Sequence, residues 1–329
     1  FTRAMARMSG ARADAVAKVP NFEEIRSAGA AIRDRVLGNL AAYLFQFEQA
    51  AQTRGVVVHW AETGADVNRI VRDIALQNGV KKIIKSKSML GEESGLNHYL
   101  QEAGLDVRET DLGEYILQIS GETPSHIIAP AIHKSKEDIG ELFERVHQLP
   151  LKKTIPEMCR EARMMLRPHF LSADMGISGA NFLVAETGSV AIVTNEGNGR
   201  MTTTMPRIHV AITGIEKVVP TLEDLSVLLR LLTRSATGQS TSNYISMLTG
   251  VRGENDSDGP EQMHVVIVDS HRSELLASEM REALRCIRCG ACMNHCPVYE
   301  AIGGHTYGWV YPGPIGSILT PSYVGLDKA

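Results

Sequence analysis

Apolar residues along this chain alternate between short continuous runs and runs with helical spacing. Continuous runs such as GVVVHW at residues 55–60 and VKKIIK at residues 80–85 are typical of buried strands. Between such runs, residues 66–76 and 136–148 place apolar side chains at i, i+3, i+4 and i+7, which predicts amphipathic helices. Strands that alternate with helices predict an α/β layered fold with a largely parallel sheet, over about residues 53–270.

Shorter patterns predict the remaining elements. Residues 1–52 are Ala-rich and predict a helical N-terminal segment. The predicted helices also include residues 154–166, 221–233 with Thr221 as N-cap, and 273–285. The predicted strands also include residues 114–120, 125–131, 207–213 and 263–269, and a pair on either side of Thr187-Gly188 within residues 181–194.

Composition and charge narrow the class of protein. The chain has 329 residues, of which 43% are hydrophobic and 22% charged, as in ordinary globular proteins. A net charge of -4 argues against a nucleic-acid partner, since such proteins gather Lys and Arg on one face. No apolar run approaches the roughly 18 residues needed to cross a bilayer, so we expect no transmembrane segment and a cytoplasmic protein, associated with a membrane only through partners.

Four of the five cysteines form one motif, CIRCGACMNHCP. Cys286, Cys289, Cys292 and Cys296 follow the spacing C-x2-C-x2-C-x3-C-P, which is the run of bacterial ferredoxins that binds [4Fe-4S] clusters. A zinc site would usually show a second, separated pair of ligands, and a disulfide framework does not fit a long chain that is otherwise poor in cysteine. We therefore predict these four residues as metal ligands, and Cys159 as a small core residue.

Ferredoxins with two clusters contain this cysteine run twice. In two-cluster ferredoxins the fourth cysteine of this run binds the other cluster. Cys286, Cys289 and Cys292 are thus predicted to hold one cubane, and Cys296 to reach toward a second. No second run of this kind follows before Ala329.

The residues after the motif resemble a known family. NHCPVYEAIGGHTYGWVYPGPIGSILTP, together with DLGEYILQI, PSHIIAPAIHK, SGANFLVAETGSV and TNEGNGR upstream, resembles the lactate utilization protein B family of bacterial L-lactate oxidation. The resemblance covers essentially the whole chain. It implies a LUD domain, similar to the NagB/RpiA/CoA-transferase fold, at residues 53–270, preceded by the helical segment at residues 1–52 and followed by a ferredoxin-like segment at residues 271–329.

The family pattern continues past PGPIG into a second cysteine run. We therefore expect this chain to be a truncated form of a longer protein that carries two [4Fe-4S] clusters, and to hold one cluster or none itself. The resemblance implies an electron-transfer role beside other lactate utilization subunits.

Two loops of the predicted α/β domain are candidates for binding a small carboxylate or another anion. The first, KSKSMLGEE, follows a strand and contains Lys85, Lys87 and Ser88, although Glu92 and Glu93 oppose an anion and the loop also fits a solvated charge run. The second combines the turn between the two predicted strands, which ordinary hairpin chemistry also explains, with the loop after them, where Arg200 supplies a fork for a carboxylate. Its candidates are Glu186, Thr187, Gly188, Asn195, Gly197, Asn198 and Arg200.

Three functions remain open at this point. The first is an electron-transfer subunit of an L-lactate-oxidising oxidoreductase complex. The second is a LUD domain that is itself catalytic on a 2-hydroxy acid, for which Lys87, Ser88, Glu186 and Arg200 must converge on one cleft and Glu186 is a candidate acid or base. The third is a non-catalytic scaffold for partner subunits.

Overall fold

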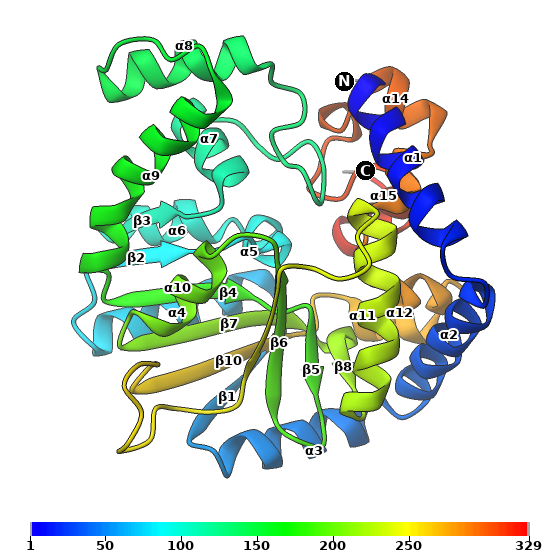
Figure 1. The fold of residues 1–329 in the computed structure, drawn as a ribbon. Coiled ribbons are helices and arrows are strands. Elements are labelled where there is room, and N and C mark those ends of the chain that lie inside the picture. The colour runs from blue at the N-terminus through cyan, green and yellow to red at the C-terminus, as the bar shows by residue number, and fades with distance from the viewer. Residues whose placement is uncertain (1, 328–329) are drawn as a thin grey trace.

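A six-stranded parallel sheet forms the centre of the molecule (Figure 1). The computed structural model describes residues 2–327. The strand order is β1-β10-β7-β4-β2-β3, and every neighbouring pair is parallel. The strands are β1 (Val56–Ala61), β2 (Lys82–Lys85), β3 (Asp106–Glu109), β4 (Met175–Gly179), β7 (Ile208–Gly214) and β10 (Gln262–Val268). The predicted α/β fold with a parallel sheet is confirmed.

Successive side chains of the central strands enter two different apolar cores. In β10, Met263 and Val265 belong to one core, whereas Val266 and Val268 belong to the other. This alternation is the period of two that a strand imposes, and it explains why strands buried on both faces read as continuous apolar runs. The first core includes side chains of α2 (Phe22–Gly38), α3 (Leu40–Gln52) and α11 (Leu222–Thr237). The second includes those of α4 (Gly64–Gln77), α5 (Met89–Ser94) and α6 (Leu96–Glu102).

A smaller four-stranded sheet, in the order β8-β5-β6-β9, packs on the first core. Its strands are β5 (Phe182–Val184), β6 (Ser189–Thr194), β8 (Val218–Val219) and β9 (Tyr244–Leu248). The antiparallel pair β5–β6 confirms the predicted hairpin around Thr187-Gly188. Gly188 has φ of +67° and lies against the backbone of Ala51, so both the turn and the close approach require glycine there.

The two ends of the chain meet at one side of the molecule. Helix α1 (Thr2–Ala17) lies beside the C-terminal helices α13 (Ala291–Asn294), α14 (Pro297–Ile302) and α15 (Gly313–Val324), as the blue and the orange-red ribbons of Figure 1 show. Met5 of α1 shares an apolar core with Tyr299, Tyr311 and Leu319. The predicted helical N-terminus is confirmed, and it supports the cysteine segment directly.

Two predicted strands are wrong. Residues 114–120 belong to helix α7 (Leu112–Ser120), which begins where the Asp111 carboxylate accepts from Gly113 N–H and ends at Gly121 in the left-handed conformation. The period of a short apolar run does not distinguish a buried helix from a strand. Here the Asp111 cap and the left-handed Gly121 mark the two ends of a helix. Residues 125–131 form a loop and turns that contact the cysteine segment.

Several other elements complete the fold. The predicted helix at 273–285 is broken into α12 (Arg272–Ala277) and a 3-10 turn at Arg281–Arg285, and the strands β3, β4, β8 and β9 were not predicted. The remaining helices are α8 (Lys136–His147), α9 (Ile155–Ser172) and α10 (Asn198–Thr204), with 3-10 turns at Ile215–Lys217 and His305–Tyr307.

Close packing between β4 and α10 gives a test of this architecture. A methyl group at Gly176 would collide with the carbonyl oxygen of Thr202, so we expect Gly176→Ala to lower the free energy of unfolding by about 3 kcal/mol. The same change at Gly197 meets no heavy atom within 4 Å and should shift it by less than about 1 kcal/mol. Urea unfolding of both variants measures the difference, and equal effects would contradict the packing described here.

Candidate functional site

A cavity of about 250 Å³ lies at the carboxyl edge of the parallel sheet. It is lined by the residues that follow three adjacent strands, β2, β4 and β7. Loops at the carboxyl ends of parallel strands are the usual place for ligands in open α/β folds. The residues after the strands are Ser86, Lys87, Ser88, Asn181, Glu216 and Lys217, and the strand ends themselves contribute Gly179 of β4 and Thr213 and Gly214 of β7.

The opposite wall of the cavity comes from the C-terminal segment. Arg288, which lies between two cysteines of the motif, and Tyr311 both line it. The loop that contributes Ile127 and Ile128 closes the same side. The cavity therefore lies between the α/β layers and the cysteine segment, and it touches both.

A buried carboxylate organises the end of the cavity next to the cysteines. Glu216 Oε2 lies 2.9 Å from Arg272 Nε, and Glu216 Oε1 lies 3.6 Å from Arg288 Nη2. Arg272 also binds both carboxylate oxygens of Glu93, at 3.0 and 2.8 Å, and the Tyr311 hydroxyl donates to Glu93 at 2.8 Å. Although burial alone would raise it, Arg272 and its cationic neighbours lower the pKa of Glu216 to about 2, so this carboxylate is charged at neutral pH.

Lys217 is the least compensated cation of this end. It lines the cavity, and within residues 2–327 it makes no hydrogen bond or ion pair. Burial and the positive charge of Arg288 lower the pKa of Lys217 to about 8. Glu216 and Cys286 oppose this fall, but neither forms an ion pair with the Lys217 ammonium group within residues 2–327.

The other end of the cavity is acidic. Lys87 lies 3.4 Å from Glu114 and donates to the carbonyl of Ile128 at 2.7 Å. Burial raises the pKa of Glu114 well above its ordinary value, and burial together with Asp111 raises that of Glu196. Lys87 is therefore surrounded by carboxyl groups and carbonyls, which compensate its charge.

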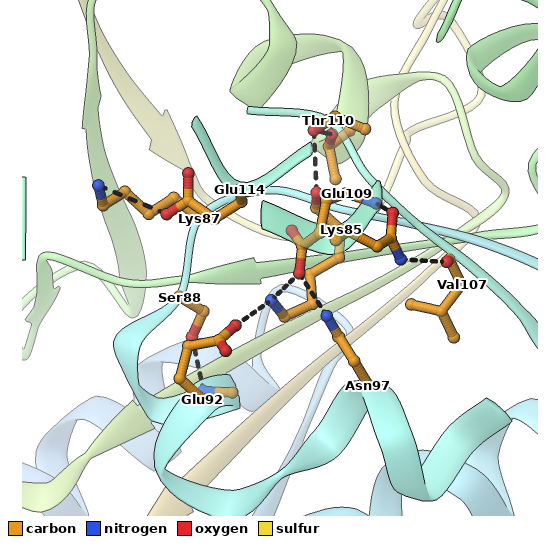
Figure 2. A network of polar contacts seen from close by, with 12 residues as sticks. Lys85, Lys87, Ser88, Glu92, Asn97, Val107, Glu109, Thr110 and Glu114 are labelled. Atoms are coloured by element: carbon orange, nitrogen blue, oxygen red, sulfur yellow. Dashed lines mark hydrogen bonds and ion pairs between the residues drawn. The ribbon is translucent and has the colours of Figure 1, made fainter. Parts of the chain in front are cut away.

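Lys85 does not reach the cavity. Figure 2 shows its side chain directed toward Glu109 and Glu92, while Lys87 points the other way toward Glu114. Lys85 is fully buried, and its ammonium group lies 2.5 Å from Glu109 and 3.3 Å from Glu92. These carboxylates raise the pKa of Lys85 despite the opposing effect of burial. Its prediction as an anion-binding residue is wrong, because its charge is already neutralised inside the fold.

The other predicted candidates lie in the cavity, in a separate groove, or outside both. Ser88, Asn195 and Asn198 line the cavity, although the Ser88 hydroxyl also accepts from Gly91 N–H as the cap of α5. Glu186 and Thr187 line a separate groove, where Glu186 accepts from the backbone N–H of Leu222.

Three further candidates, Gly188, Gly197 and Arg200, line neither the cavity nor this groove. Gly188 completes the turn against α3, Gly197 precedes α10, and the guanidinium of Arg200 lies 5.4 Å from the centre of the Tyr244 ring. Lys87, Ser88, Glu186 and Arg200 therefore do not form the common cleft that a catalytic set would need.

The cysteine segment folds back on itself through two residues with positive φ. Arg288 has φ of +61° and Gly290 of +75°, and the N–H of Arg288 donates to Cys286 Sγ at 3.4 Å. Burial raises the pKa of Cys289 to about 11, and neighbouring Cys286 and Cys292 add to that rise. Thiols that raise one another's pKa are deprotonated together only when a nearby cation neutralises the thiolates, and iron ions do so. The spacing of the three residues suits thiolate ligands of a cluster, although within residues 2–327 no three His, Cys, Asp or Glu side chains are arranged to hold a single metal ion.

Cys296 faces different surroundings from Cys289. Cys289 packs against the first apolar core, whereas Cys296 packs against the core of the C-terminal helices and accepts from Tyr299 N–H at 3.4 Å. Cys159 lies exposed on α9, so its prediction as a core residue is wrong. The apolar pattern correctly predicted a helix around Cys159, but the Cys159 side chain lies on the exposed face of that helix.

Comparison with known proteins finds a family match for the α/β domain and another for the cysteine segment. Residues 44–268 match the LUD domain family, and residues 282–327 match the 4Fe-4S dicluster domain. The chain is 47% identical to lactate utilization protein B of Geobacillus sp. (strain WCH70), over 98% of this chain and 68% of that protein. The chain belongs to the lactate utilization protein B family.

Further family relatives agree. Lactate utilization protein B of Bacillus subtilis (strain 168) is 46% identical over 98% of this chain and 68% of its own length. An uncharacterized electron transport protein, YkgF of Escherichia coli (strain K12), is 48% identical over 97% and 67%. The chain thus spans about two thirds of the length of these relatives. A solved DUF162 family structure from Deinococcus radiodurans aligns with a TM-score of 0.40 and 16% identity, over 70% of this chain and 98% of that one.

The cofactor of this family member is a [4Fe-4S] cluster, in the segment where the four cysteines gather. Within residues 2–327, no helix combines the length and the apolar character that a membrane crossing requires.

Thr213, Lys217, Arg272 and Arg288 were not predicted as site residues. Arg288 lies inside the cysteine motif, whereas the others carry no motif. One signal was present for Thr213 and Lys217, because they surround the end of a predicted strand, where α/β folds place ligands. The role of Arg272 has no such signal, since its partners Glu93 and Glu216 are distant in the sequence.

The buried pair of Lys85 and Glu109 gives a second test. We expect Lys85→Met to lower the free energy of unfolding by about 3–5 kcal/mol, because it leaves Glu109 buried without its cation. Lys82→Met, on the exposed start of the same strand, is the matched control and should change it by less than about 0.5 kcal/mol. Urea unfolding measures both, and a Lys85→Met protein as stable as the control would show that Lys85 has no structural role.

Proposed function

We propose that this chain is the iron–sulfur electron-transfer subunit of a bacterial system that oxidises L-lactate to pyruvate. The single observation that carries the proposal is the folded cysteine segment, in which Cys286, Cys289 and Cys292 lie in electrostatic contact beside buried cations. The names of the relatives, lactate utilization protein B and an electron transport protein, support the substrate and the role.

The electron balance suits a relay. Oxidation of lactate to pyruvate releases two electrons and two protons, whereas a [4Fe-4S] cluster, when bound, accepts and gives one electron at a time. The chain must therefore pass the electrons on singly, which calls for a donor and an acceptor among the other lactate utilization subunits. We place this exchange in the cytoplasm.

The cysteines take separate roles in the proposal. Cys286, Cys289 and Cys292 hold one cubane, and Cys296, which packs against a different core, is directed to a second. Arg288 lies within the ligand loop, and its charge together with that of Arg33 offsets the negative charge of a cluster with thiolate ligands.

The separation of the predicted catalytic residues favours electron transfer over catalysis by that set. Lys87 lines the cavity while Glu186 lies in another groove, so the two cannot act on one substrate carbon. In the proposed organisation, residues 1–52 support the cluster segment, residues 53–270 form the LUD domain, and residues 271–329 carry electrons.

Cysteine substitutions test the assignment. We expect Cys289→Ser to lose most of the bound iron and sulfide of anaerobically purified protein, because an alcohol replaces a thiolate ligand. Cys159→Ser is the matched control and should keep both, since Cys159 is exposed on α9. Iron and acid-labile sulfide, measured per chain, decide the matter. If Cys289→Ser kept its full iron while Cys159→Ser lost it, the ligand assignment would be overturned.

A further inference from the structure

Three hydrogen-bond donors line the cavity without an acceptor inside the described chain. The Thr213 hydroxyl and Nη1 of Arg288 are buried and have no hydrogen-bond partner within residues 2–327. Lys217 lacks one as well. Buried polar groups are normally paired, so donors that share one cavity without acceptors indicate a ligand that supplies them.

The charges near these donors are unbalanced. Within residues 2–327, Arg33, Lys217, Arg272 and Arg288 lie around two buried carboxylates, those of Glu93 and Glu216, with the Cys286 thiol near three of the four cations. Arg272 takes up most of both carboxylates, and Arg33 donates to backbone carbonyls of Val218 and Leu284. Lys217 and Arg288 therefore remain as the cations that face the cavity, and Arg288 shares its charge between Glu216 and the cysteine loop.

The rest of the cavity restricts the kind of anion. Its volume of about 250 Å³ suits a small metabolite, and Ile128, Ile192, Ile212 and Leu232 give it apolar walls. Asp111 and Glu196 at the far end would repel a second negative charge. A ligand with one anionic group and a short, mostly uncharged body meets these conditions.

We propose that this cavity binds the carboxylate group of a small organic acid between Thr213, Lys217 and Arg288. The planar guanidinium of Arg288 matches the two oxygens of a carboxylate, and the Lys217 ammonium adds a point charge. The charged Glu216 beside Arg288 favours a monoanion over a phosphate dianion.

The site is coupled to the cysteine loop through Arg288. An anion in the cavity would share the positive charge of Arg288 with the thiolates of that loop. This inference goes beyond the proposed function and does not rest on lactate being the substrate. Loss of iron in Cys289→Ser tests the proposed electron-transfer function, and carboxylate binding in the cavity tests the anion site.

Isothermal titration of anaerobically purified, cluster-loaded protein tests the site with lactate, pyruvate and inorganic phosphate as probes. We expect lactate or pyruvate to bind, and phosphate to bind more weakly. Lys217→Met should weaken binding of the carboxylate about tenfold or more, because a charge-assisted contact is lost. Lys81→Met, an exposed residue at the opposite end of β2, is the matched control and should bind as the unaltered protein does.

Thr213→Val separates a ligand contact from a structural role. The change keeps the side chain's shape and removes a hydroxyl that no described residue pairs, so the free protein should melt no lower than the unaltered one. Carboxylate binding should nevertheless weaken about fivefold. The proposal is overturned if neither carboxylate binds at millimolar concentration, if phosphate binds more tightly, or if Lys217→Met and Thr213→Val both bind as the control does.

Discussion

The buried carboxylate of Glu216 is the constraint on which the arrangement of this molecule depends. A charged group inside a protein is tolerated only when partners surround it, and Glu216 finds them in Arg272 and Arg288. Its own backbone carbonyl accepts from Arg33. These partners come from α2, from α12 after the last strand of the sheet, and from the cysteine motif. One carboxylate thus ties the N-terminal helices, the α/β layers and the cysteine segment together.

The cysteine segment is consequently part of the main body of the protein. Besides its contact with Glu216, it is held by the Tyr299 hydroxyl, which donates to the Ser125 carbonyl at 2.5 Å, and by the ring of His126, which bonds Asn294 at 3.1 Å. Ser9 of α1 donates to the carbonyl of Asn294 from the other side. A ligand loop fixed at several points undergoes little reorganisation when its charge changes, which suits the proposed single-electron relay.

The cavity owes its character to the same network. Glu216 holds Arg288 at the boundary between the sheet edge and the cysteines, so one residue lines the cavity and also belongs to the ligand loop. Lys85, by contrast, is paired with Glu109 in the interior and does not line the cavity. Two lysines only two positions apart, Lys85 and Lys87, therefore have unrelated roles, because Lys85 is the last residue of β2 whereas Lys87 lies in the loop that follows the strand.

By itself, the sequence determined the local features whose physics is short-range. The ferredoxin spacing, the apolar periods of α4 and α8, the Thr221 cap and the turn at Gly188 each depend on residues within a few positions of one another. Only the tertiary structure decided that the run at 114–120 is a helix, that Cys159 is exposed, and that Glu186 and Arg200 lie outside the cavity. It also brought Thr213 and Lys217 to the cavity wall opposite Arg288. Those outcomes depend on charge pairs and packing between residues far apart in the chain, such as Arg272 with Glu93, and no local pattern records them.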